Sequence, residues 1–249
     1  MHIQTAQAHT QTGLARIVGV LFLVQFALFL IPLIVLGSAI NWPVSLGDPA
    51  SEVLPRIAEQ ASAVTIGYSG YFASALLLLP IAVLVSQLFD KRYSGLILTG
   101  AILGSIASFA KLFGIARWLV AMPFLADIYL DPAATDVTRE ATIVVYTALN
   151  EYAGGVGELL GVALFSGLWT LAVAVLIMRT RQLPVWLGWF GLVAAAISLL
   201  LSTGLLGVQF GTALLVGQGV VWQLWMIAMG VVLLVNRHTA SAAVAPSAA

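Results

Sequence analysis

The sequence predicts an all-α integral membrane protein whose chain crosses the bilayer six times, and three observations predict it. Charged residues make up only 8% of the 249 residues, where a soluble domain carries roughly 25%. Hydrophobic residues make up 61%, and the mean hydropathy is +1.06. Six separate stretches are each long enough, at roughly 18 or more apolar residues, to cross the hydrocarbon core as a helix.

The six predicted spans lie at 17–40, 63–89, 96–121, 154–178, 185–208 and 212–235. The first span has features of a signal peptide, because Arg16 precedes it and Gly37-Ser38-Ala39 has the form of a cleavage site. Its apolar stretch is longer than the 7 to 15 residues of a signal peptide, so we expect a retained helix. The sequence thus predicts one transmembrane domain at 17–235, a short tail at 1–16, and a disordered tail rich in Ala and Ser at 236–249.

Lysine and arginine predict the orientation of the six helices. With the N-terminus in the cytoplasm, only Arg56 and Arg139 lie in outer loops. Six basic residues then lie on the inner side: Arg16, Lys91, Arg92, Arg179, Arg181 and Arg237. An excess of Lys and Arg marks the cytoplasmic side of a membrane protein. We therefore expect a multi-pass protein of the cell (inner) membrane with both termini in the cytoplasm.

The second outer loop is predicted to hold an additional amphipathic helix. Asp131-Pro132 has the form of an N-cap followed by a proline in the first turn. Apolar residues then recur at helical spacing at Val137, Ala141, Val144, Ala148 and Leu149. Gly154-Gly155 is predicted to form a hinge between this helix and the fourth span. In the first outer loop, Ser51-Glu52 is a candidate helix start, and Pro55 argues against a long helix.

Four charged residues remain inside or at the entrance of the spans: Lys111, Arg117, Glu151 and Glu158. A charge that faces lipid costs at least a few kcal/mol, so such groups usually face the interior and pair. At 1.5 Å per residue, Lys111 lies about 28 Å from Arg92, and Glu158 lies about 31 Å from Arg179. The two are nearly level on antiparallel helices, and the count for Arg117 and Glu151 is similar. We therefore predict the facing pairs Lys111–Glu158 and Arg117–Glu151.

Other polar residues project to the same level and predict a polar cavity open to the outside. They are Tyr68, Tyr71, Asn150, Ser202, Thr203 and Gln218. The candidate ligand or ion-pair site consists of Lys111, Arg117, Asn150, Glu151, Glu158 and Tyr71. The alternative is that these charges lie in the headgroup region and only hold helices together. Gln25, Gln218 and Gln223 are expected to be hydrogen-bond partners between helices and not ligands.

Motifs for catalysis or metal binding are weak in this sequence. Gly67-Tyr68-Ser69-Gly70 matches the GxSG of rhomboid proteases, but their serine needs a histidine base, and His2, His9 and His238 all lie outside the spans. The same positions and the lack of cysteine argue against zinc sites. Gly155-x-Gly157-x-x-x-Gly161 lacks the strand-turn-helix setting of a dinucleotide site and predicts close helix packing. We expect no catalytic residues, no cofactor and no bound metal.

Two segments resemble an uncharacterised bacterial membrane family, domain of unknown function 4386. The first is Leu14-Ala15-Arg16-Ile17-Val18-Gly19-Val20-Leu21-Phe22-Leu23. The second runs from Gly167-Leu168-Trp169 through a basic turn to Leu183-Pro184-Val185-Trp186-Leu187-Gly188-Trp189. The resemblance implies a six-span integral membrane protein, and it brings no catalytic residue, substrate or cofactor.

Three functions remain open from the sequence. The first is a non-enzymatic membrane protein that binds or transports a small molecule or ion through an outward-facing polar cavity. The second is a signalling or scaffold component whose buried charges are structural. The third is an intramembrane enzyme that uses Glu158 as a base. The expected partner is the lipid bilayer, with a small molecule or ion as ligand; zero net charge without a basic run argues against nucleic acid.

Overall fold

The computed structural model describes residues 2–235, with side chains for 12–211 and 213–235, and this part of the chain is helical throughout its regular structure. Six stretches are long and apolar enough to cross a membrane, which confirms the predicted all-α polytopic fold. The first half contains α1 (His2–Ile40), η1 (Val44–Gly47), α2 (Ala50–Glu59), α3 (Ala61–Ser86), η2 (Lys91–Tyr93) and α4 (Ser94–Leu119). The second half contains α5 (Ala121–Leu130), α6 (Asp136–Gly154), the π-helix η3 (Gly155–Phe165), α7 (Ser166–Thr180), α8 (Val185–Leu201), η4 (Ser202–Leu206) and α9 (Thr212–Val235).

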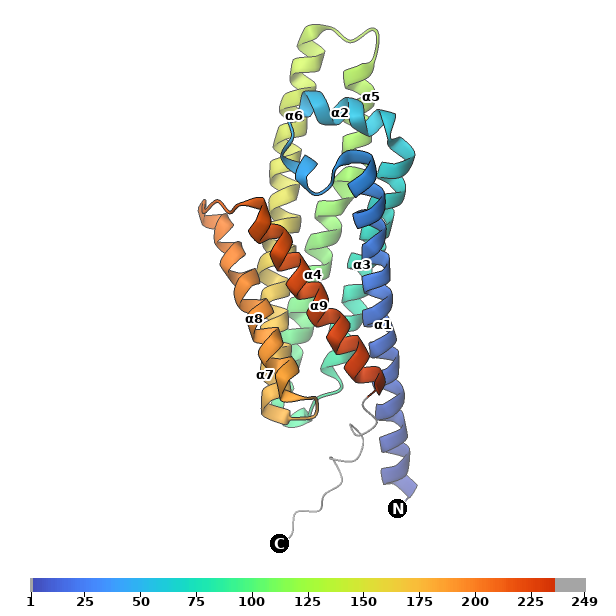
Figure 1. The fold of residues 1–249 in the computed structure, drawn as a ribbon, viewed down its shortest axis with the longest axis vertical. Coiled ribbons are helices and arrows are strands. Elements are labelled where there is room, and N and C mark those ends of the chain that lie inside the picture. The colour runs from blue at the N-terminus through green and yellow to red at the C-terminus, as the bar shows by residue number, and fades with distance from the viewer. Residues whose placement is uncertain (1, 236–249) are drawn as a thin grey trace.

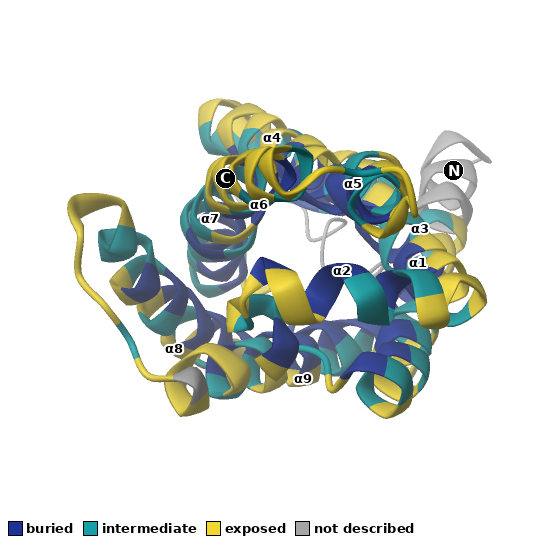
Figure 2. Ribbon diagram, turned by 90° about the horizontal axis from the view of Figure 1, so that it is seen from above, coloured by how far each residue is buried: buried dark blue, intermediate teal, exposed yellow. Residues whose placement is uncertain are grey.

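The spanning helices form a closed ring. Helix α1 packs on α3, α3 on α4, α4 on η3 and α7, α7 on α8, and α8 on α9. Contacts between α9 and α1 complete the ring, which Figure 2 shows from above. The start of α1 and the end of α9 lie at one end of the bundle, here called the terminal end, and the α5–α6 turn projects from the other, the hairpin end (Figure 1).

Glycines bring the backbones of neighbouring helices close together. A Cβ atom on Gly114 of α4 would lie 2.6 Å from the Cα atom of Gly157 in η3. A Cβ atom on Gly161 would lie 2.8 Å from the backbone nitrogen of Lys111. Small residues at such positions let membrane helices approach closely. The predicted packing role of the Gly155-x-Gly157-x-x-x-Gly161 pattern is therefore confirmed for Gly157 and Gly161.

The hairpin end corrects three predictions about the outer loops. Helix α6 begins at Asp136 with Thr135 as its N-cap, since the Thr135 hydroxyl accepts the Thr138 N–H at 3.2 Å. Asp131 instead closes a turn by accepting the Ala133 N–H at 2.8 Å. Gly154-Gly155 forms no break, because the chain continues from α6 into η3 as a helix. The third span continues past its predicted end as α5, which is apolar and packs against α2 and α6.

Two apolar cores lie one above the other in the bundle. The terminal-end core contains Phe22, Trp169, Trp225 and Met229, with the Trp169 and Trp225 rings 5.7 Å apart. The hairpin-end core joins α2 to the bundle through residues such as Leu36, Leu54, Ile57, Tyr68, Trp118, Met122 and Tyr146. Along α1, the residues between Phe22 and Leu36 include the buried polar side chain of Gln25. A polar layer thus separates the two cores.

The two predicted tails, at 1–16 and 236–249, compare differently with the structure. Helix α1 already begins at His2, so residues 2–16 continue the first span as a helix. The predicted disordered tail at 236–249 lies outside the described residues.

Candidate functional site

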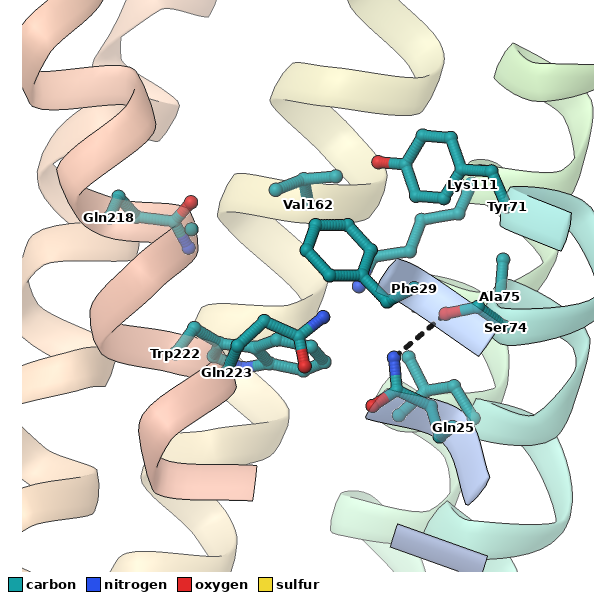
Figure 3. A pocket seen from close by; sticks show the side chains of 12 residues that line it. Gln25, Phe29, Tyr71, Ser74, Ala75, Lys111, Val162, Gln218, Trp222 and Gln223 are labelled. Atoms are coloured by element: carbon teal, nitrogen blue, oxygen red, sulfur yellow. Dashed lines mark hydrogen bonds between the residues drawn. The ribbon is translucent and has the colours of Figure 1, made fainter. Parts of the chain in front are cut away.

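A cavity of about 70 Å³ lies in the polar layer between the two cores. Five elements line it, with Gln25 and Phe29 from α1, Tyr71, Ser74, Ala75 and Leu78 from α3, Lys111 from α4, Val162 from η3, and Gln218, Gly219, Trp222 and Gln223 from α9. The side chains of α1, α3 and α4 face those of α9 across the space (Figure 3). Since a water molecule occupies about 30 Å³ in the liquid, the cavity has room for a few waters or a small organic molecule.

Lys111 is the cationic residue of this cavity. The residue is only 7% exposed, and its Nζ atom lies 4.2 Å from the centre of the Trp222 ring. A cation over a tryptophan face gains about 0.5 to 2 kcal/mol, whereas an uncompensated buried charge costs several kcal/mol. Across the described side chains, no carboxylate lies within ion-pair distance of Lys111 and no hydrogen bond from its ammonium is formed. The Trp222 face therefore compensates only part of the cost of burying this charge.

Amide side chains supply most of the other polar groups around the cavity. Gln25 donates to the Ser74 hydroxyl at 2.9 Å, and Gln218 donates to the Ser198 hydroxyl at 2.8 Å. These two hydrogen bonds join α1 to α3 and α9 to α8, which confirms the prediction for Gln25 and Gln218. Gln223 differs, because its buried Oε1 atom has no partner in the described part of the chain. Gln223 lies across the cavity from Lys111 with its amide nitrogen toward Phe29 (Figure 3).

Arg117, six residues beyond Lys111 on α4, is paired. Its Nη2 atom lies 3.3 Å from Oε1 of Glu158 in η3, and its Nη1 atom donates to the Gly114 carbonyl at 3.2 Å. The Arg117 side chain is 6% exposed, while that of Glu158 is 54% exposed. The predicted pairs Lys111–Glu158 and Arg117–Glu151 are therefore wrong, because Arg117 takes the carboxylate that the sequence assigned to Lys111.

The direction of the side chains explains this exchange of partners. Each Cα–Cβ bond of an α-helix tilts toward the N-terminus of the helix. Arg117 therefore leans back along α4, as its bond to the Gly114 carbonyl shows, while Glu158 leans toward the start of its own antiparallel helix. The two lean toward each other. Lys111 leans back in the same sense as Arg117, which takes it away from Glu158 and toward Trp222.

An aromatic and polar layer surrounds the Arg117–Glu158 pair on the hairpin side. The Arg117 guanidinium lies 5.6 Å from the Trp118 ring, and Trp118 stacks on Tyr68 at 5.0 Å. The hydroxyls of Tyr68 and Tyr146 and the Nε atom of Arg117 are buried without a partner among the described residues. Unpaired buried polar atoms usually mark a site for ordered water or another group.

A family model described as Domain of unknown function (DUF4386) matches residues 17–233 of the chain. The chain belongs to the DUF4386 family. This match confirms the resemblance drawn from the first span and from the turn between the fourth and fifth spans. A search of curated proteins and a search of solved structures each return no match. Membership of DUF4386 assigns no activity to the chain, and the membrane character rests on the six apolar helices.

The structure of this DUF4386 chain separates the six residues predicted to share one site. Lys111 and Tyr71 line the cavity, and Arg117 and Glu158 form the ion pair. Asn150 instead donates to the Leu46 carbonyl at 3.4 Å, where α6 meets η1, and Glu151 is exposed. Ser202 and Thr203, which were expected at the same level, donate to backbone carbonyls of α8. The predicted site is therefore two adjacent sites, with Asn150 and Glu151 outside both.

Sequence reasoning missed the part of the cavity that α9 provides. Gln218 was placed at the correct level, and Trp222 follows it by four residues and so lies on the same helix face. Phe29 follows Gln25 on α1 in the same way. This spacing puts Trp222 on the face of α9 that carries Gln218, but it does not say that this face meets Lys111.

The serine motif of the second span is a packing feature in the DUF4386 structure. A Cβ atom on Gly70 would lie 2.7 Å from the side chain of Ile31, and Gly67 meets Leu36. Ser69 is exposed on the opposite face. Among the side chains that the structure describes, at 12–211 and 213–235, no three His, Asp or Glu residues lie close enough together to hold a metal ion.

Proposed function

We propose that this protein binds a small polar molecule or ion in the cavity between α1, α3, α4 and α9, without catalysing a reaction. The observation that carries the proposal is the Lys111 ammonium, which lines the cavity and has no carboxylate partner in the described structure. Intramembrane ionisable residues commonly mark ligand or ion sites. A bound molecule would complete the pairing that the protein leaves open.

The second candidate, a signalling or scaffold component with structural charges, is favoured by the other buried cation. Arg117 has its carboxylate and a backbone carbonyl, and it joins α4 to η3. We assign the structural role to this pair and the binding role to Lys111. The third candidate, an enzyme with Glu158 as base, has less support because Glu158 accepts from Arg117 and does not line the cavity.

We further propose that both termini face the cytoplasm of a bacterial inner membrane, so that the hairpin end faces outward. The excess of basic residues in the turns at the terminal end supports this orientation, since Lys91 and Arg92 lie in η2, and Arg179 and Arg181 lie at the end of α7. Reporter fusions at Ala134 and Gln182 test it, and a cytoplasmic Ala134 would overturn it.

The molecules that remain bound during purification test the binding function. Gly219 lines the cavity, and a Cβ atom there meets nothing within 4 Å, so Gly219→Leu is designed to reduce the cavity without a clash with the backbone. Gly217 also has free space and does not line the cavity, so Gly217→Leu is the matched control. We expect mass spectrometry of extracts of the purified proteins to detect a bound compound in the wild type and in Gly217→Leu but not in Gly219→Leu. Equal amounts of every compound in all three would overturn the proposal.

A further inference from the structure

We propose that the ligand of this cavity is a small monocarboxylate whose negative charge pairs with Lys111 and whose short apolar chain lies against Phe29 and Trp222. The inference rests on the proposed binding function and names the class of molecule. It goes beyond the cavity itself, because the chemistry of the walls selects one charge and one shape.

The charge of the lining residues selects an anion. Lys111 is the one charged residue among the twelve described residues that line the space. The ammonium carries three N–H donors and no acceptor. One side of it is covered by the Trp222 face at 4.2 Å, which leaves donors directed toward the cavity. A cation would be repelled here, and a neutral molecule would leave the buried charge unpaired.

The hydrogen-bonding groups around Lys111 agree with an anion. The amide nitrogen of Gln223 faces the space from α9, and it makes no hydrogen bond to another described residue (Figure 3). The Tyr71 hydroxyl can donate as well, from the α3 side. Lys111, Gln223 and Tyr71 therefore contribute donors to the walls of the same cavity, and a carboxylate with two oxygen atoms can accept from more than one donor.

The remaining walls select a small molecule with an apolar part. Phe29 and Trp222 present ring carbons, and Leu78 and Val162 present aliphatic carbons. The volume of about 70 Å³ restricts the ligand to few heavy atoms. Multiply charged anions such as phosphate are usually held by arginine forks and several backbone N–H groups, and Arg117, six residues beyond Lys111 on α4, is already paired with Glu158. A short-chain carboxylate fits both the charge and the apolar surface.

Propionate, propionamide and chloride are suitable probes. Propionate and propionamide have nearly the same shape and differ in charge, whereas chloride has the charge without the apolar chain. We expect propionate to raise the unfolding temperature of the detergent-solubilised full chain by at least twice as much as propionamide or chloride at equal concentration. The shift should vanish in Lys111→Gln and persist in Lys91→Gln, where the substituted lysine is exposed in η2.

A second variant, Gly219→Leu, keeps the test valid if Lys111→Gln fails to fold. Gly219→Leu retains Lys111 and should also remove the propionate shift, while Gly217→Leu should keep it. Equal shifts with propionamide or chloride, or a propionate shift that survives Lys111→Gln or Gly219→Leu, would overturn the carboxylate assignment. Equal propionate and propionamide shifts that both vanish in Gly219→Leu would leave the proposed binding function standing, so failure of the two proposals can be distinguished.

Discussion

The surroundings of Lys111 and of Arg117 differ although the two residues lie six positions apart on the same helix. Both are less than 10% exposed, and each lies close to a tryptophan ring. Arg117 has a carboxylate oxygen at 3.3 Å and a backbone carbonyl oxygen at 3.2 Å, whereas Lys111 lines a cavity and has no such partner among the described residues. Burial and charge alone therefore do not separate a structural cation from a binding one. We therefore base the proposed distinction on whether the protein supplies a partner for the charge.

The largest effect is expected from removing the partner of Arg117. Glu158→Gln leaves the guanidinium buried without a counter-charge, and breaking a fully buried pair in this way costs 3 to 5 kcal/mol. Because the Glu158 side chain is 54% exposed, we expect a smaller loss in the free energy of unfolding, about 2 kcal/mol. Chemical unfolding in detergent measures it. Glu151→Gln is the matched control, since Glu151 is exposed and forms no ion pair in the described structure, and an equal loss in both variants would contradict the role of the pair.

A smaller effect is expected at an ion pair outside the membrane. Asp90 and Arg92 lie 2.7 Å apart in the turn between α3 and α4, closer than Arg117 and Glu158. The Arg92 side chain and its backbone N–H both donate to Asp90 and hold the pKa of this carboxyl below its usual value. A lowered folded-state pKa contributes stability above the unfolded-state pKa, and the contribution is lost as the pH falls through the folded-state pKa. Water screens this exposed pair, so distance alone is a poor guide to its strength.

The measurement for this pair is the unfolding free energy as a function of pH and salt. Asp90→Asn should cost less than Glu158→Gln at neutral pH, and its cost should fall toward zero in acid and at high salt. A cost for Asp90→Asn that equals that of Glu158→Gln would contradict the comparison between buried and exposed pairs.

The sequence predicted the helices that can span the membrane and, among four candidate charges, the three that form the cavity and the ion pair: Lys111, Arg117 and Glu158. Apolar runs decide the number of spans, because the bilayer leaves the backbone few other structures. The α5–α6 projection was harder to predict, since Ala121–Leu130 is apolar by composition like a membrane span, and it packs against α2 and α6.

The partners of the four charges could not be read from residue depth alone. Counting residues along the helices places Glu158 between the depths of Lys111 and Arg117. A shift of a few ångströms along the helix axis therefore decides which cation Glu158 meets. The cavity also depends on α9, whose side chains come from far along the chain. Trp222 and Gln223 have nothing in their local sequence to mark them as neighbours of Lys111, and only the ring of packed helices brings them there.

The central claim is that Arg117 is paired for a structural role, whereas Lys111 is left unpaired to bind a ligand. A comparison of unfolding free energies tests this claim most directly. Lys111→Met and Arg117→Met are measured against the wild type in ligand-free detergent buffer. Replacing an unpaired buried charge by an apolar side chain of similar length should leave stability unchanged or raise it by about 1 kcal/mol. Arg117→Met should lower it by about 1 to 3 kcal/mol, because the variant loses the bonds to Glu158 and to the Gly114 carbonyl. A loss in Lys111→Met as large as that in Arg117→Met would contradict the account.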